Sequence, residues 1–346
     1  MSYLQYLDIA GHVAQVGMTL TLITNSILTY ITIFHIKNIT GAYKFSIVLL
    51  AVLGIIFAVM ERFVHPFMHS FNRSFVYFTN APTFGSTALL KALPLLIHSE
   101  IYVVIICVIA IQFVYRYLLI SLSELVKLFS GWKSIFWLAY LATFMGLWAV
   151  SAVVSLPDDV SIEYLKMEMI ERYGRLSDEL GGVFIVAYSY ENENEHNLLL
   201  RTNSMISVFG LSMVLGAQYI VITFCGFKIY RKIQKSIKMT SNSHNRIQSQ
   251  LFKTLVIQIA APSILFNLPV LLMLTVPYFD LQISFPSGVV IGFFSTYPAL
   301  DSWILMCLVT EYHRAIAKIL RNWQLRALEW TNRFISGTEI DGTMAA

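Results

Sequence analysis

Cysteine and charge are both scarce in this 346-residue chain. The only cysteines are Cys107, Cys225 and Cys307. All three fall within or at the edge of apolar stretches, so the sequence excludes a disulfide between outer loops, and the thiols are interpreted as small buried apolar side chains. Charged residues make up 13% of the chain against 57% hydrophobic residues, which is far from the balance of a soluble globular protein.

Sequence patterns of catalysis and metal binding are also absent. The chain has no zinc-type His/Glu spacing, no phosphate-binding glycine loop and no Ser/His constellation. We therefore expect no enzymatic activity, no metal site and no cofactor, and nothing points to a nucleic-acid partner. An internal repeat, which a secondary transporter would show, is missing as well.

What the chain does contain is long apolar stretches. A hydrocarbon core of ~30 Å takes about 20 helical residues to cross, and each stretch is about that long. They are Val13–Phe34, Phe45–Phe63, Leu93–Tyr115, Ile135–Ser155, Ser204–Phe227, Leu255–Pro277 and Gly288–Thr310. The pattern predicts an all-α membrane protein, a seven-transmembrane helix bundle over residues 13–310, with residues 1–12 as an extracellular N-terminus.

Lysine and arginine are unevenly divided between the two sets of loops. Of the 24 basic residues, 17 lie in the first, third and fifth connections and after the last stretch. The positive-inside rule therefore places the N-terminus outside and the C-terminus in the cytoplasm. The opposite topology would suit a ligand-gated ion channel of the seven-helix odorant-receptor kind, which is the alternative that this count disfavours.

Two outer connections carry further signals. Asn72 begins an Asn-Arg-Ser sequon and is a candidate glycosylation site. The second outer connection, from Leu156 to about Asn203, has apolar residues at helical spacing, which predicts a short amphipathic helix across the extracellular mouth. Ten acidic residues in this connection are either a funnel for cations or an ordinary solvated surface.

An apolar stripe with basic neighbours follows the last stretch. It predicts an amphipathic juxtamembrane helix over residues 311–330, lying on membrane lipids of the inner leaflet. The polar residues 331–346 are predicted to form a disordered cytoplasmic tail.

Short sequences in a fixed order carry a family resemblance. They are Tyr43-Lys44, Pro66 to His69, Phe113 to Tyr117, Gln250 to Lys253 with Gln258, Pro277 to Asp280, and Tyr297 to Asp301. In this order and spacing the chain resembles nematode seven-transmembrane chemoreceptors of the Str type, the family that includes the diacetyl odorant receptor. Ser302 departs from the family, whose members commonly carry a second proline there.

The resemblance implies a G-protein-coupled chemosensory (olfactory) receptor. Such a receptor binds a small odorant or soluble chemical cue and activates a heterotrimeric G protein. The resemblance also implies a multi-pass protein of the plasma membrane, in the ciliary membrane of a chemosensory neuron.

The inner ends of the helices hold the candidate switch and coupling residues. Arg116, between Tyr115 and Tyr117, is interpreted as a switch that holds the resting bundle or meets a partner, with lipid snorkelling as the alternative. Asp301 could hold an ion or water network or make a structural hydrogen bond. Four basic residues could dock the G protein, hold anionic lipid or only set the topology: Lys228, Arg231, Lys232 and Lys253.

Polar residues nearer the outer side are the candidate ligand-binding residues. Glu100 lies sixteen residues, about 24 Å, above Arg116, where an unpaired carboxylate is costly unless it faces the bundle. His98 is its neighbour in sequence, as a partner or as an interfacial residue. The remaining candidates are Asn267 in the sixth stretch and Ser295 and Tyr297 in the seventh.

Overall fold

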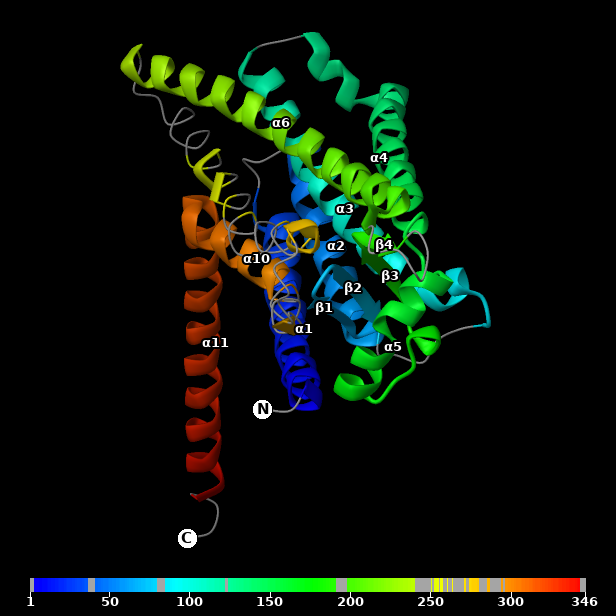
Figure 1. Cartoon of the computed structure of the whole chain (residues 1–346). Helices are drawn as coiled ribbons and strands as arrows, with labels where there is room; N and C mark the ends of the chain where they lie inside the picture. Colours follow the sequence, from blue (N-terminus) through cyan, green and yellow to red (C-terminus); the bar gives the residue numbers. More distant parts are fainter. Residues whose placement is uncertain are drawn as a thin grey trace.

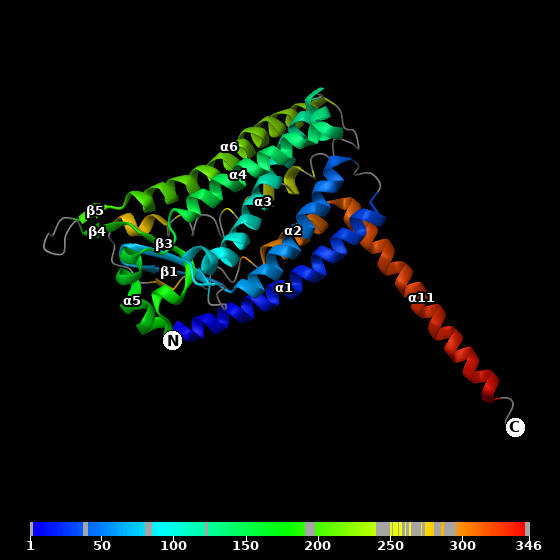
Figure 2. The ribbon, with the colours of Figure 1, turned by 90° about the vertical axis from the view of Figure 1, so that its right-hand side faces the viewer.

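The computed structural model describes residues 3–36, 41–79, 85–121, 124–190, 198–239 and 296–342, together with parts of the segment 250–294. Long helices form a bundle, a small sheet lies at one end of it, and a long C-terminal helix projects from the other (Figures 1 and 2).

Five helices in the described residues are long and apolar enough to cross a membrane. They are α1 (Tyr3–Phe34), α2 (Ala42–Val64), α3 (Ala88–Ile120), α4 (Ile135–Val153) and α6 (Thr202–Met239). They match the first five predicted stretches. Most of the sixth stretch and the start of the seventh fall outside the described residues, and α10 (Tyr297–Leu308) forms the inner part of the seventh. The prediction of a helical membrane bundle is confirmed.

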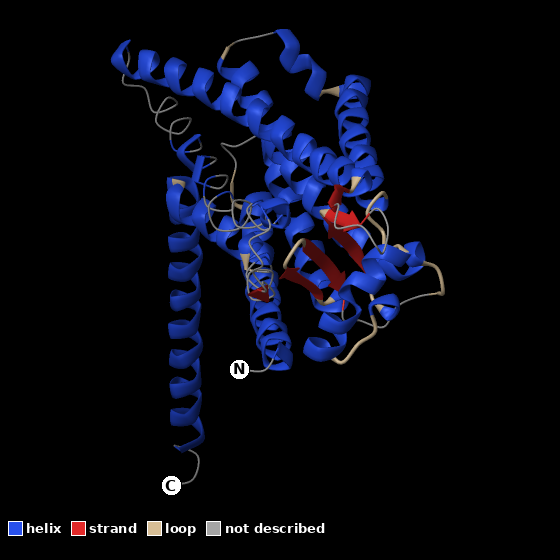
Figure 3. Ribbon diagram, viewed as in Figure 1, coloured by secondary structure: helices blue, strands red, loops and turns tan. Residues whose placement is uncertain are grey.

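A four-stranded antiparallel sheet covers the outer end of the bundle, which the sequence analysis did not predict (Figure 3). Its order is β3 (Gly181–Val186), β2 (Ser74–Thr79), β1 (Pro66–Phe71) and β6 (Phe285–Pro286). Because β1 and β2 belong to the first outer connection and β3 to the second, the sheet joins the two outer loops without a covalent bond. A separate pair, β4 (Tyr188–Tyr190) and β5 (Leu198–Leu200), extends the second loop.

The predicted amphipathic helix of the second outer connection is present as α5 (Asp159–Tyr173). Asp158 caps its N-terminus by accepting a hydrogen bond from the Ser161 backbone N–H at 2.9 Å, and Ser161 reciprocates to the Asp158 backbone. This reciprocal pair satisfies backbone donors that helix formation leaves without partners. Gly174 ends the helix with φ of 63°, a conformation that favours glycine.

Alternation along the strands gives the sheet two different faces. One face packs Phe67, Val76, Phe78 and Phe184 against apolar side chains of α5. The other face, with Phe75, Val183 and Ile185 at its centre, turns toward the helices. Side chains of a strand alternate between faces, so each short strand serves both contacts.

The last helix, α11 (Thr310–Gly342), leaves the end of the bundle opposite the sheet and runs at a steep angle to α1 (Figure 2). It contains the predicted juxtamembrane helix and keeps residues 321–329 exposed. It also continues through 331–342, where the sequence analysis predicts a disordered tail, because no proline interrupts the backbone hydrogen bonds there. Likewise α1 begins at Tyr3, so helix occupies most of the segment 1–12.

Candidate functional site

A cavity of about 130 Å³ lies between the sheet and the outer halves of the helices. Its walls come from the inner face of the sheet, from α2, α3, α4 and α6, and from Leu271, Leu274 and Phe294 of the sixth and seventh stretches. The sheet contributes Met68, Phe75, Tyr77, Val183 and Ile185. Apolar and aromatic side chains dominate the lining, and among the described residues no Asp, Glu, Lys or Arg takes part in it. Such a site suits an uncharged ligand.

His98 is the main polar feature of this cavity. Its Nδ1 lies 3.0 Å from the Tyr77 hydroxyl, and its ring stacks on Phe57 with 4.6 Å between the ring centroids. The side chain is only 4% exposed, and its Nε2 has no hydrogen-bond partner among the described residues. A buried polar atom without a partner is costly to the folded state.

Glu100, the other predicted ligand-binding residue of α3, does not line the cavity. Cys107 lies seven residues further along, on the same face of the helix, and packs against Val214 of α6 and Tyr140 of α4. Both carboxylate oxygens of Glu100 are buried, and neither has a hydrogen-bond partner in the described part of the chain. Both residues belong to α3, but His98 lines the cavity and Glu100 lies on another face of the helix.

The remaining predicted ligand residues are in the seventh and sixth stretches. Tyr297 is buried in the cluster that joins α2, α3 and α6, next to Phe57 and Ile105, and it is not part of the cavity wall. Asn267 and Ser295 lie outside the described residues.

At the inner end of the bundle, Arg116 is buried, with 2% of its surface exposed. Its guanidinium carbon lies 4.0 Å from the centroid of the Tyr43 ring. Within the part of the chain that the structure describes, Nε and Nη1 have no hydrogen-bond partner and no carboxylate forms an ion pair with this side chain. Cation–π contact with Tyr43 offsets only part of the cost of burying the charge, so Arg116 is not a snorkelling residue but a strained buried cation.

The neighbours of Arg116 point to different helices. Tyr115 packs edge-on against Phe129, with 4.9 Å between the ring centroids, and Tyr117 packs against Phe224 of α6 at 6.4 Å. The three consecutive residues therefore contact three different parts of the inner surface.

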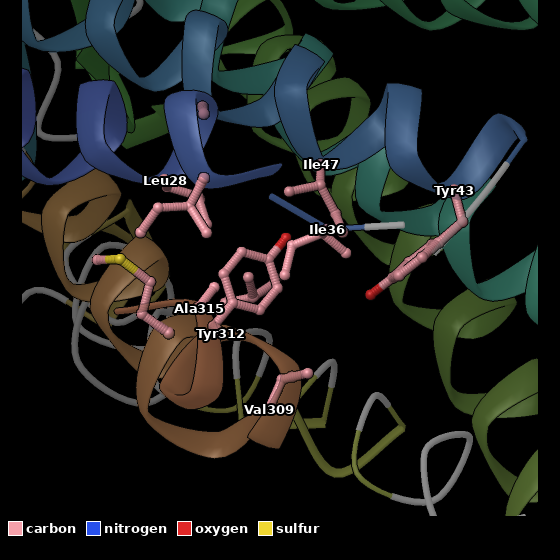
Figure 4. Packing of buried hydrophobic residues seen from close by; sticks show 11 residues of the cluster. Leu28, Ile36, Tyr43, Ile47, Val309, Tyr312 and Ala315 are labelled. Carbon is pink, nitrogen blue, oxygen red and sulfur yellow. The ribbon is translucent and has the colours of Figure 1, made fainter. Parts of the chain in front are cut away.

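Tyr43 also belongs to the apolar cluster that joins α1 and α2 to α10 and α11 (Figure 4). Figure 4 shows Tyr312 of α11 at the centre of this cluster, among Leu28 and Ile36. The Tyr312 hydroxyl lies 2.8 Å from Thr32 Oγ1. The beginning of α11 is thus fixed to α1.

Asp301 lies half-buried on α10, within electrostatic range of Tyr43 and Tyr297. Its neighbour Ser302 donates a hydrogen bond to Asn25 Oδ1 of α1, and Asn25 Nδ2 donates to the Ala51 carbonyl of α2 at 3.0 Å. The residue that departs from the family pattern therefore ties three helices together.

The predicted coupling residues on the inner surface are exposed. Lys228, Arg231 and Lys232 lie in the last third of α6, and Lys253 lies just before the sixth stretch. Lys228 Nζ lies 5.5 Å from the ring centroid of Phe224. Their charges are open to anionic lipid and to a partner protein.

Several charges of the outer cap are paired with one another, and Glu163 with Lys166 is one such pair. Glu168 is buried and accepts from His69 Nε2 at 3.1 Å and from Arg172 Nε at 3.3 Å. Asp158 pairs with Arg201. Burial raises the pKa of Asp158, but hydrogen bonds from Ser161 and the Arg201 guanidinium outweigh this and hold that pKa below its usual range. Since no acid among the described residues lines the cavity, the solvated and structural interpretation of the acidic loop is favoured over the cation funnel.

Asn72 occupies the two-residue turn between β1 and β2 with φ of 46°. Asn tolerates this left-handed conformation better than most residues. The geometry of the turn is by itself a sufficient reason for an asparagine at position 72. Glycosylation of Asn72 stays a prediction.

Sequence reasoning missed the cavity residues of the sheet. A usable signal was present, because aromatic and β-branched residues alternate on both sides of Asn72, as in a hairpin. The apolar bias of the whole chain hid this pattern, since strand residues and helix residues share the same composition.

The fold is that of a seven-helix membrane bundle. The crystal structure of squid rhodopsin matches with a TM-score of 0.59 over 94% of this chain and 87% of that chain, at 13% sequence identity.

The family model for the serpentine type 7TM GPCR chemoreceptor Str matches residues 10–317. The chain therefore belongs to this family of nematode chemosensory G-protein-coupled receptors. It is 36% identical to G-protein coupled receptor str-33 of Caenorhabditis elegans, over 90% of this chain and 91% of the relative. It is 25% identical to serpentine receptor class r-10 of the same organism, over 88% and 89%. Nothing found supports the ion-channel alternative.

Proposed function

We propose that the cavity beneath the outer sheet binds the small-molecule odorant or chemical cue of this receptor, and that the ligand is uncharged. The observation that carries the proposal is the lining of this cavity, which is mostly apolar and aromatic and holds no charged side chain among the described residues. Desolvating a charged ligand there would be costly because the described lining offers no opposite charge. Glu100, Asn267, Ser295 and Tyr297 stay predicted contributors to binding or to its transmission.

Binding shifts the receptor toward a signalling state only if the ligand prefers that state. We place the corresponding change at the inner end, where the buried Arg116 rests on Tyr43. Because its guanidinium is poorly satisfied there, a conformation that gives it hydrogen-bond acceptors is accessible at modest cost. A heterotrimeric G protein supplies such acceptors, and the exposed Lys228, Arg231, Lys232 and Lys253 contribute to its docking.

The proposed location is the ciliary membrane of a chemosensory neuron, with α11 resting on lipids of the inner leaflet. The amphipathic sequence of α11 and its direction away from the bundle support the placement of this helix on the inner leaflet.

The test is a signalling assay in intact cells with an epitope at the N-terminus. A panel of small uncharged molecules is applied with and without a co-expressed Gα subunit, and calcium or cAMP is recorded. We expect external labelling and a response that depends on Gα. A ligand-gated current from the purified, reconstituted receptor without G protein would contradict the proposal.

A further inference from the structure

The inner half of α6 has two faces of opposite character. One face is buried and packs in the cluster that α3 shares, and its residues are Ile222, Cys225, Ile229 and Ile233. The other face is exposed, and it carries Ile220, Phe224, Phe227, Lys228 and Arg231. Because the members of each set recur at intervals of three and four residues, each set lies on one side of the helix. The exposed set, here named the outward face of α6, therefore turns away from the bundle.

Depth in the membrane changes along this face. The apolar stretch over residues 204–227 is about 36 Å long as a helix, which is enough to cross a hydrocarbon core of ~30 Å. Lys228 follows this stretch directly, and Arg231 lies about 4.5 Å further along the axis. The outward face is therefore apolar where it meets the hydrocarbon and basic where it reaches the inner headgroups.

Both cations lie over aromatic rings of the same face. The Lys228 Nζ atom is 5.5 Å from the centroid of the Phe224 ring, and the Arg231 guanidinium carbon is 5.6 Å from that of Phe227. Each ring precedes its cation by one turn, because side chains of a helix lean toward its N-terminus. In α6 that direction leads toward the hydrocarbon, whereas a snorkelling side chain extends toward water. The rings thus hold two charges at the boundary, where an unpaired charge is costly.

The chain itself supplies little to balance these charges. Residues 196–279 contain no Asp or Glu. Among the described residues, neither Lys228 nor Arg231 forms an ion pair. Two like charges three residues apart on a helix also repel each other. An anion bound between them lowers both costs, and the cytoplasmic leaflet supplies anionic headgroups at this depth.

We infer that the outward face of α6 binds an anionic phospholipid of the inner leaflet, with the headgroup phosphate between Lys228 and Arg231 and an acyl chain along Phe224 and Ile220. The guanidinium fork suits two phosphate oxygens, and the ammonium adds a point charge. Since this face turns away from the bundle, the two cations contribute to G-protein docking through the bound lipid. The inference does not depend on the outer cavity.

The experiment measures which lipid the purified receptor retains. Receptor in detergent is incubated with equal amounts of dioleoylphosphatidylserine and dioleoylphosphatidylcholine, and native mass spectrometry counts the bound molecules of each. The two lipids share their acyl chains and differ in headgroup charge. A basic residue near an anionic lipid contributes about fivefold in affinity. Wild-type receptor should therefore retain phosphatidylserine in preference by about tenfold or more.

Glutamine variants assign the preference to the two cations. Lys228→Gln and Arg231→Gln should each lower it about fivefold, and the double variant should abolish it. Lys127→Gln is the matched control, because Lys127 is an exposed base of the inner surface that already pairs with Glu124. This control removes the same charge and should leave the preference unchanged. Far-UV circular dichroism and monodispersity show whether each variant is folded.

Several results would overturn the inference. They are equal retention of the two lipids by wild-type receptor, full preference in the double variant, and an equal loss in Lys127→Gln, which would mean that only net charge matters. The wild-type comparison decides even if a variant does not fold. Weaker G-protein binding by the double variant in nanodiscs of phosphatidylcholine alone, with the lipid preference intact, would assign the two cations to the protein partner instead.

Discussion

Replacement of Gly181 by alanine tests how the outer sheet is held over the cavity. Gly181 begins β3 and lies directly against the first turns of α3, where a Cβ atom would overlap the backbone carbonyl of Lys91. Backbone cannot rotate away as a flexible side chain does, so strand and helix must separate. With no outer disulfide available, strand pairing and this close approach carry the attachment of the second outer loop.

The magnitude follows from the cost of overpacking. An extra methyl group in a packed site costs about 1–3 kcal/mol, which corresponds to a fall in melting temperature of about 1–4 °C for a chain of this size. Since Val183 and Ile185 of the same strand line the cavity, ligand potency should fall as well. Thermal unfolding of the purified receptor and the dose–response curve measure the two effects.

Gly216→Ala on α6 is the matched control. A Cβ atom there meets nothing within 4 Å, and alanine favours a helix over glycine by about 1 kcal/mol, so stability should hold or rise. If Gly181→Ala matches wild type in melting temperature and potency, the close approach of β3 to α3 does not position the sheet, and the reasoning is wrong.

Three further outcomes are expected. Asp158→Ala should lower stability by about 1 kcal/mol at neutral pH, because the helix cap that pairs with Ser161 is lost. Since the pKa of Asp158 is depressed in the folded state, the stability that this carboxylate contributes is present above its unfolded pKa of ~3.9 and is lost as pH falls through its folded pKa. The melting temperatures of wild type and variant should therefore converge in acid. Arg116→Ala should impair G-protein activation with little change in ligand affinity, and equal signalling would remove Arg116 from the mechanism. Tyr312→Phe should lower the melting temperature, because Thr32 loses its buried partner, and Thr32→Val alone should lower it to a similar degree, with the double variant no worse than additive.

The family resemblance located the inner switch region but not its contacts. Arg116 was identified by its place at the end of the third stretch, and the structure places its guanidinium over Tyr43, a residue 73 positions earlier in the chain. Depth along a helix can be counted from the sequence, whereas direction around it depends on the neighbours. His98 and Glu100 illustrate this, because both were predicted at ligand depth and only His98 lines the cavity.

The sequence by itself determined the membrane-spanning helices, their orientation, the helix in the second outer loop and the family. These features depend on local composition, periodicity and the distribution of basic residues, all of which can be read without knowing which segments meet. The sheet, the cavity beneath it and the pairing of Tyr77 with His98 were decided only by the tertiary structure. They join residues of the first outer loop, the second outer loop and α3. No local sequence pattern predicts which strands will pair when they are far apart in the chain. The physical reason is that strand pairing and side-chain direction are settled by contacts, while helix formation in a membrane is settled by the need of each segment to satisfy its own backbone.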